Sequence, residues 1–319
     1  MDNIALVCTS HVALLNAPGA IPDDVEPGLN AATDKLREFV REFDPDLVIQ
    51  FGDDHNSGFS LSLMPAFCVG MRAVCIGDFD TSSGPLLTDE AVARELVASL
   101  HDRGVDVATS YAMQVDHGFT QAIDLLFGGI DAVPVVPVFI NCGGDLRPPM
   151  HRVKALGDAV GAFCRGLGDR RVLLLGSGGL SHDPPLPAFI DAPPEVQQVL
   201  IDGIDYTPEL LEKRTERILQ AARDFAGANT GGYLELNPEW DLHILEQFER
   251  GKLADIAQYE DHWILSEGGR GGQEIRMWLA PFAALAAAAG SGRYVATQEY
   301  YRAVPELFVG YGMMHARAA

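Results

Sequence analysis

Cationic side chains are scarce in this 319-residue sequence. Lysine and arginine together number 23, against 45 aspartates and glutamates, and the formal net charge is −22. Because a surface this acidic repels nucleic acid and anionic lipid, we expect no nucleic-acid partner and no membrane partner. An anionic small substrate would need a local basic residue to bind against this field.

Cysteine pairs and long apolar runs are also missing. The longest apolar stretch, 277–289, contains Pro281 and is shorter than the roughly 20 residues that span a bilayer. The amino terminus shows no signal-peptide pattern. No CxxC motif is present, and four of the five cysteines lie in or beside apolar runs, as buried thiols do. We therefore expect reduced thiols and a cytoplasmic location.

Known phosphate and nucleophile motifs are absent from the glycine-rich stretch "LGSGGLSH". Ser177 lacks the glycine two residues before it that a G-x-S-x-G elbow requires. Ser181 stands where the last glycine of G-x-G-x-x-G would be, and the sequence has no Walker A motif. Phosphate chemistry therefore has no support.

Apolar runs alternate with helical patterns over the first 180 residues. Five runs are continuous, which is typical of strands covered by helices on both faces: 3–9, 46–52, 72–78, 132–141 and 171–177. Three segments between them have the three-and-four spacing or the caps of helices: 29–43, 88–104 and 152–168. This alternation predicts a three-layer α/β/α fold with a largely parallel or mixed central sheet.

The segment from about 190 to 270 has a different pattern, mostly helical and strongly charged. It ends in the glycine-rich loop 267–274, which leads into an apolar helix over 275–289. No linker, low-complexity segment or internal repeat interrupts the chain. We expect one domain over 1–319 that carries a helical excursion toward its carboxyl end.

Three histidines follow predicted strands in the same way. His11 comes after "IALVCTS", His55 after "DLVIQFGDD" and His182 after "VLLLGSGGLS". The carboxyl ends of strands in an open α/β sheet lie along one edge, where ligands bind. We therefore expect these side chains to share a site. His117, in the loop-like stretch "MQVDHGFTQ", is a fourth candidate.

Histidines grouped with carboxylates are typical metal ligands. Two histidines and one carboxylate on a ferrous ion leave positions open for substrate and dioxygen, and zinc hydrolases use similar ligands. The spacing does not distinguish these two kinds of site. Nor does it choose the carboxylate, for which the candidates are Asp53, Asp54, Asp116, Asp183 and Glu274.

Six motifs occur in order: "CTSHV", "FGDDHN", "SYAMQVDHGFTQ", "VPVVPVFIN", "LLLGSGGLSHDPP" and "GGQEIRMW". Together they resemble the class III extradiol ring-cleaving dioxygenases, typified by the catalytic subunit of protocatechuate 4,5-dioxygenase. Within that superfamily, "FCVGMRAVCIGDF" and "LGSGGLSHDPP" are most similar to members that act on 3-substituted catechols. The similarity extends to about residue 305 and is weakest across 190–265.

The resemblance implies an Fe(II) enzyme that uses O2 to cleave a catechol such as 2,3-dihydroxyphenylpropionate or 2,3-dihydroxycinnamate, giving a hydroxy-dienoate. It implies that His11, His55 and Glu274 bind the iron. His117 and His182 would be acid–base groups, His182 as the base, with Asp116 orienting His117. The family forms homo-oligomers, so we expect one here.

The substrate carboxylate would need a cation, and the candidates are Arg302 in "YYRAVP" and Arg276 beside Glu274. Two other functions stay open. An iron-free relative acting as a binding protein would be expected to lose a ligand or an acid–base histidine, yet all five positions are filled. A zinc hydrolase would not need the second pair of histidines.

Overall fold

The computed structural model describes residues 3–184, 189–227 and 233–319. Residues 228–232 of the expected helical excursion lie outside these ranges, as do 185–188. Within them, one sheet has eight strands in the order β10-β11-β1-β9-β2-β8-β3-β6. Their bounds are β1 Ile4–Thr9, β2 Leu47–Gly52, β3 Phe67–Gly70, β6 Ala108–Ser110, β8 Val135–Ile140, β9 Val172–Ser177, β10 Tyr294–Val304 and β11 Val309–Ala318.

The sheet is mixed, as predicted. Its centre is parallel, because β9 pairs in parallel with both β1 and β2, and β2 pairs in parallel with β8. Every residue of β1, β2, β8 and β9 is buried, which explains their continuous apolar sequences. The carboxyl ends of these strands therefore lie at one edge.

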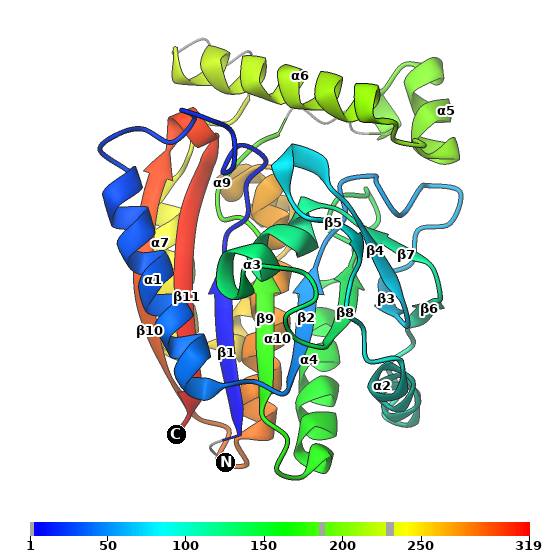
Figure 1. The fold of residues 1–319 in the computed structure, drawn as a ribbon, viewed down its shortest axis with the longest axis vertical. Helices are drawn as coiled ribbons and strands as arrows, with labels where there is room; N and C mark the ends of the chain where they lie inside the picture. Colours follow the sequence, from blue (N-terminus) through cyan, green and yellow to red (C-terminus); the bar gives the residue numbers. More distant parts are fainter. Residues whose placement is uncertain (1–2, 185–188, 228–232) are drawn as a thin grey trace.

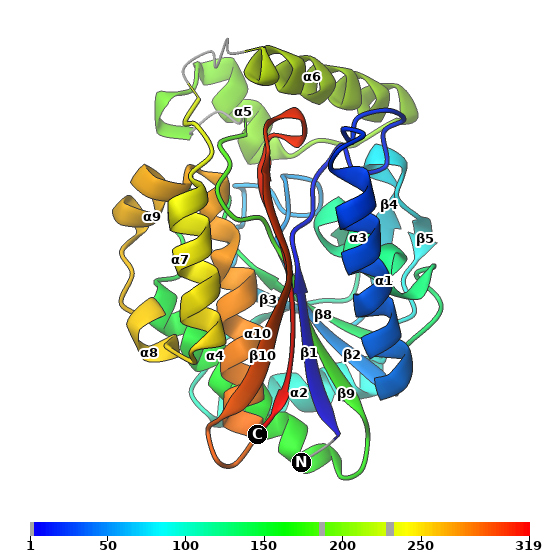
Figure 2. The same ribbon diagram turned by 90° about the vertical axis from the view of Figure 1, so that its left-hand side faces the viewer.

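Helices cover both faces of the sheet and form the predicted three layers (Figure 2). One face carries α1 (Glu26–Phe43) and α3 (His117–Phe127), and the other carries α4 (Met150–Cys164) and α10 (Arg276–Ala288). Helix α2 (Glu90–Asp102) packs beside α4. A Cβ on Gly157 or Gly161 of α4 would lie 2.2 or 2.1 Å from a backbone oxygen of α10. These two glycines therefore let the helices approach closely.

The expected helical excursion is confirmed in the described ranges. It comprises α5 (Pro194–Asp202), α6 (Pro208–Ala226), α7 (Pro238–Glu249), α8 (Leu253–Ile256) and α9 (Asp261–Gly268). Helices α7 and α8 pack toward α10, whereas α6 lies across the carboxyl edge of the central strands in both views (Figures 1 and 2). Helix α6 thus covers the edge at which the strand-end histidines were expected.

The chain after residue 290 forms two strands that the sequence did not predict. β10 and β11 are joined by the 3-10 turn Pro305–Leu307, and β11 pairs antiparallel with β1. In β10 only Ala296 and Val304 are buried. Because its other side chains are exposed or half-buried, β10 has no continuous apolar run to reveal it.

The run at 72–78 is a strand but not a central one, so this part of the prediction was wrong. β4 (Ala73–Ile76) belongs to a separate three-stranded sheet with β5 (Ser83–Pro85) and β7 (Met113–Val115). Val74 is 47% exposed, so β4 is not covered on both faces.

The five cysteines are buried and form no disulfide. In the described part of the chain, no helix combines the length and apolarity needed to cross a bilayer.

Candidate metal centre and active site

Four histidines and Glu274 come together at the carboxyl edge of the central sheet. His11 follows β1, His55 follows β2 and His182 follows β9, as the sequence predicted. His117 is the first residue of α3 rather than part of a loop. All four histidines line one cavity. Glu274 reaches the same place from the 3-10 turn Gly271–Ile275, which precedes α10.

Three of these side chains have the spacing of ligands around a single ion. His11 Nε2 lies 3.4 Å from His55 Nε2 and 3.6 Å from Glu274 Oε2. His55 Nε2 lies 3.7 Å from Glu274 Oε1. Donors that sit about 2.1 Å from one ion at ordinary angles are roughly 3–3.5 Å apart. A small contraction of the cluster would therefore bring all three donors onto one cation.

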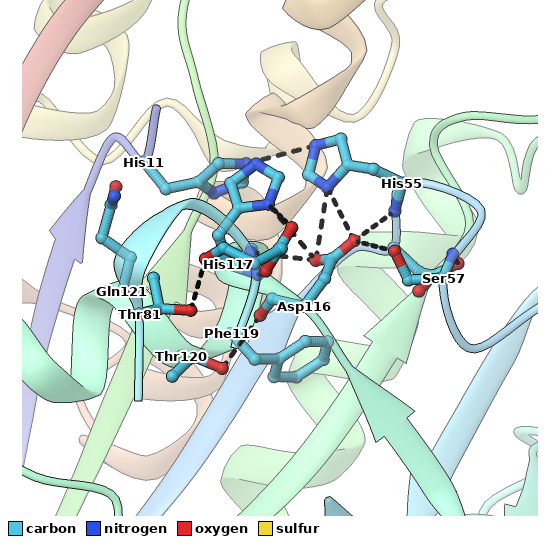
Figure 3. A network of polar contacts seen from close by, with 12 residues as sticks. His11, His55, Ser57, Thr81, Asp116, His117, Phe119, Thr120 and Gln121 are labelled. Atoms are coloured by element: carbon cyan, nitrogen blue, oxygen red, sulfur yellow. Dashed lines mark hydrogen bonds and ion pairs between the residues drawn. The ribbon is translucent and has the colours of Figure 1, made fainter. Parts of the chain in front are cut away.

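The second nitrogen of each imidazole is held by a partner, which aims Nε2 at the cluster. His11 Nδ1 lies 3.1 Å from Ser177 Oγ. His55 Nδ1 lies 3.2 Å from Asp116 Oδ2 (Figure 3). Metal-binding histidines are commonly oriented in this way through the nitrogen that does not bind the metal. Glu274 is held as well, because Oε2 accepts a hydrogen bond from the Gly179 N–H.

The charges around the cluster favour a cation. Burial lowers the pKa of His11 to about 3, so its imidazole is neutral and able to bind a metal. Burial would also lower the pKa of His55, but the carboxylates of Asp53 and Asp116 outweigh it and raise that pKa well above its usual value. Burial disfavours an ionised Glu274, yet His182 and His11 hold its pKa well below the usual range.

Asp53 gives a further sign that the site fits a metal. Its carboxylate is 2% exposed and lies 3.8 Å from His11 Nε2 and 3.5 Å from His55 Nε2. Its Oδ1 has no hydrogen-bond partner among the described residues. A buried carboxylate oxygen without a partner is costly unless a cation satisfies it. Two of the carboxylates that the sequence left open, Asp53 and Glu274, therefore face the same point.

His182 lies beside this cluster and faces the cavity. Its Nδ1–H donates to the Leu180 carbonyl at 3.0 Å, so Nε2 is the nitrogen that can exchange a proton with a ligand. That nitrogen lies 3.3 Å from Glu274 Oε1. Burial lowers the pKa of His182, but the Glu274 carboxylate more than reverses this, and the pKa is raised overall.

Glycines make room for the His182 ring. A Cβ on Gly179 would lie 2.4 Å from His182 Cε1, and a Cβ on Gly271 would lie 2.1 Å from the same atom. Real side chains do not approach this closely, so a larger residue at either position would displace the imidazole. The glycine-rich stretch after β9 thus serves to place a histidine.

His117 is oriented by a residue that the sequence analysis missed. Its Nδ1 lies 2.7 Å from Asp78 Oδ2 but 4.0 Å from Asp116 Oδ1. Asp116, expected to orient His117, instead caps α3 and accepts hydrogen bonds from the His55 N–H and the Ser57 hydroxyl (Figure 3). The signal for Asp78 was present, because it follows an apolar strand as the other site residues do.

The rest of the cavity wall is mostly apolar. It is formed from the loop after β1, the turn between β10 and β11, and one side of α6. Its apolar residues include Val12, Leu14, Ile218, Leu307 and Phe308. An apolar wall with a few polar groups at one end is typical of a site for a small organic molecule, and here the histidines supply the polar groups.

Comparison with known proteins identifies the family. Residues 5–312 match the family described as "Catalytic LigB subunit of aromatic ring-opening dioxygenase". The chain belongs to this family. It is an extradiol dioxygenase, as the six motifs predicted.

Curated relatives of the dioxygenase cover nearly its whole length. Three of them carry the name "2,3-dihydroxyphenylpropionate/2,3-dihydroxicinnamic acid 1,2-dioxygenase". The one from Mycolicibacterium vanbaalenii is 44% identical over 99% of this chain and 98% of its own. The one from Mycolicibacterium smegmatis is 45% identical over 98% of each chain. The one from Photorhabdus laumondii is 43% identical over 98% of this chain and 97% of its own.

The two arginines expected to bind a substrate carboxylate do not line the cavity of the dioxygenase. Arg302, on β10, pairs with Asp24 at the surface. Arg276 is fully buried, and its guanidinium donates to the Pro148 carbonyl and to Asp261. Both guanidinium groups are thus engaged in contacts that hold the fold together.

Two arginines of α6 line the cavity instead, Arg214 and Arg217. Neither arginine was a candidate from the sequence, because the family resemblance is weakest across 190–265. The helical pattern also gave no sign that α6 would lie over the edge of the sheet.

Proposed function

We propose that this enzyme is an Fe(II)-dependent extradiol dioxygenase of 2,3-dihydroxyphenylpropionate or 2,3-dihydroxycinnamate. One observation carries the proposal: a three-donor cluster of His11, His55 and Glu274 lies beside two further histidines that line the same cavity. The family supports ring opening, and the names of the curated relatives support these substrates. The reaction adds both atoms of O2 across one ring bond and gives an open-chain hydroxy-dienoate.

His11, His55 and Glu274 would hold the iron, and Asp53 adds a second carboxylate to the same cluster. When bound, Fe(II) would supply the Lewis acidity that favours ionised catechol hydroxyls and the redox chemistry that couples the ring to dioxygen. The three proposed ligands would come from the ends of β1 and β2 and from the turn before α10. Two of them, His11 and His55, line the cavity in which the substrate would bind.

His182 would take a proton from the catechol at Nε2. Its ring is fixed by the Leu180 carbonyl on one nitrogen and by the close packing of Gly179 and Gly271. A general base needs this arrangement, with one nitrogen anchored and the other directed at the substrate. His182 is therefore proposed as a base and not as a metal ligand.

His117 would deliver a proton as the ring opens. The Asp78 carboxylate accepts a hydrogen bond from Nδ1 and holds the ring in place, which leaves Nε2 for the substrate. The ring stacks on that of His55, with centroids 4.4 Å apart, so it borders both the cluster and the cavity. The two uncoordinated histidines thus approach the substrate from different elements.

Several further expectations remain part of this proposal. We infer a homo-oligomer from the family resemblance and a cytoplasmic location from the reduced thiols. The acidic net charge of −22 supports the absence of nucleic-acid and membrane partners. A single domain over 1–319 is likewise proposed.

The test is anaerobic reconstitution with Fe(II), or with Zn(II) as control, followed by 2,3-dihydroxyphenylpropionate and then air. We expect a yellow ring-fission product and one O2 consumed per product with iron, and neither with zinc. Absence of product and of O2 uptake with every catechol tried, at one iron per chain, would contradict the proposal.

A further inference from the structure

Helix α6 presents one side to the histidine cavity. The residues of that side are spaced as neighbours on a helix: Arg214, Arg217, Ile218, Ala221 and Ala222. Three of them are apolar and two are cationic. In a protein with a net charge of −22, two cations on the wall of an otherwise apolar cavity indicate that each has an anionic partner, either in the protein or in a ligand.

Arg214 is already engaged by the protein. Its guanidinium donates to Ser57 Oγ at 3.2 Å and to the His55 carbonyl at 3.3 Å, and it lies 3.4 Å from Asp78 Oδ2. It also lies over the Phe79 ring, 5.2 Å from the centroid. Arg214 is therefore a counter-ion for the carboxylate that orients His117.

Arg217, one turn further along α6, has no such partner. Its side chain is exposed at the cavity wall. Across the described ranges, it makes no hydrogen bond, ion pair or ring contact. Of the two cations that line the cavity, Arg217 is the one with a guanidinium available to a ligand.

We propose that Arg217 binds the side-chain carboxylate of the substrate and thereby selects catechols that carry an acidic side chain. This inference rests on the proposed function. A guanidinium binds a carboxylate through two parallel hydrogen bonds, and the apolar residues beside it accommodate the alkyl part of the side chain. The catechol ring lies toward the histidines, and the acidic chain extends toward α6.

Arg223 provides a matched control. It is an exposed arginine of the same helix that does not line the cavity. Arg217→Met and Arg223→Met each remove one positive charge from α6, so they change the overall field of the protein equally. Only the first removes the proposed carboxylate partner.

The measurement is kcat/KM for 2,3-dihydroxyphenylpropionate and for 3-propylcatechol, in which a methyl group replaces the carboxylate. The quantity compared is kcat/KM for the acid divided by kcat/KM for 3-propylcatechol. We expect Arg217→Met to lower this ratio about tenfold, mainly by raising KM for the acid, because one partly exposed charged pair is lost. Arg217→Lys should recover part of the loss. Arg223→Met should leave the ratio within about twofold of wild type.

Results that contradict the role of Arg217 differ from results that contradict the proposed function. A ratio unchanged in Arg217→Met, or lowered equally in Arg223→Met, would overturn the role of Arg217 while leaving ring cleavage intact. A wild-type enzyme that cleaves neither catechol would contradict the proposed function itself. Cleavage of 3-propylcatechol by Arg217→Met reports that the variant is folded.

Discussion

The edge of the central sheet and helix α6 meet at one cavity, but they hold their side chains differently. At the sheet edge, His11 and His117 are each 4% exposed and Glu274 is 3% exposed. In α6, by contrast, only Ala222 and Phe225 are buried. The proposed reaction chemistry thus rests on a largely buried region whose side chains are held by hydrogen bonds, and substrate selection rests on a helix at the surface.

This difference predicts different consequences of substitution. Changes at the sheet edge should alter metal binding or turnover, because every group there is fixed by a second partner. Changes in α6 other than at Arg214, which contacts the His55 carbonyl, should alter KM and leave the metal centre intact. The experiments below are ordered by expected effect, and each compares the two regions.

The largest effect is expected at Glu274. Glu274→Gln keeps the size of the side chain but removes the only charge among the three proposed ligands. We expect iron content after reconstitution and desalting to fall to about a tenth of the wild-type value or less, with ring cleavage lost. Metal analysis and circular dichroism would check this. Full iron content in a folded variant would exclude Glu274 as a ligand.

A smaller and more selective effect is expected from the two carboxylates that orient histidines. Asp116→Asn should weaken iron binding about tenfold or more, since Asp116 holds the proposed ligand His55. Asp78→Asn should leave iron affinity near wild type and lower kcat about tenfold or more, since Asp78 holds the acid–base residue His117.

Iron titration together with steady-state kinetics distinguishes the two variants. If Asp78→Asn lost iron and Asp116→Asn retained it, the assignment of the two carboxylates would have to be reversed.

The smallest effect is expected at the start of α6. Thr207 caps this helix, because its hydroxyl accepts a hydrogen bond from the Leu210 N–H. Thr207→Ala should cost about 1 kcal/mol of local helix stability. We expect KM for the acidic substrate to rise about twofold, with iron content unchanged, because α6 lines the cavity but supplies none of the proposed ligands. Loss of iron in this variant would show that the two regions are coupled.

The sequence predicted the sheet edge far better than it predicted α6. Buried parallel strands have continuous apolar sequences, so the positions of His11, His55 and His182 followed directly from the ends of three runs. Asp78 also ends a predicted strand, but it was missed because strand ends were considered as site candidates only where a histidine follows. β10 was missed because its partly exposed side chains form no apolar run.

The place of the α6 arginines at the cavity could not be predicted from the sequence pattern, for a different reason. An amphipathic helix shows which side it buries but not which part of the protein it packs against. Arg302 and Arg276 were favoured by their places in the sequence, but the protein engages both in structural contacts. Only the packing of α6 across the sheet edge brings Arg217 to the cavity.

The histidines of the site are proposed to divide into metal ligands and acid–base groups. The decisive variant is His182→Ala, with iron content and the rate of ring cleavage measured on the same reconstituted sample. We expect about one iron per chain and a cleavage rate that falls roughly a hundredfold or more, because a general base is lost. Loss of both iron and activity would indicate that His182 is a metal ligand. An unchanged cleavage rate would show that His182 is not the base.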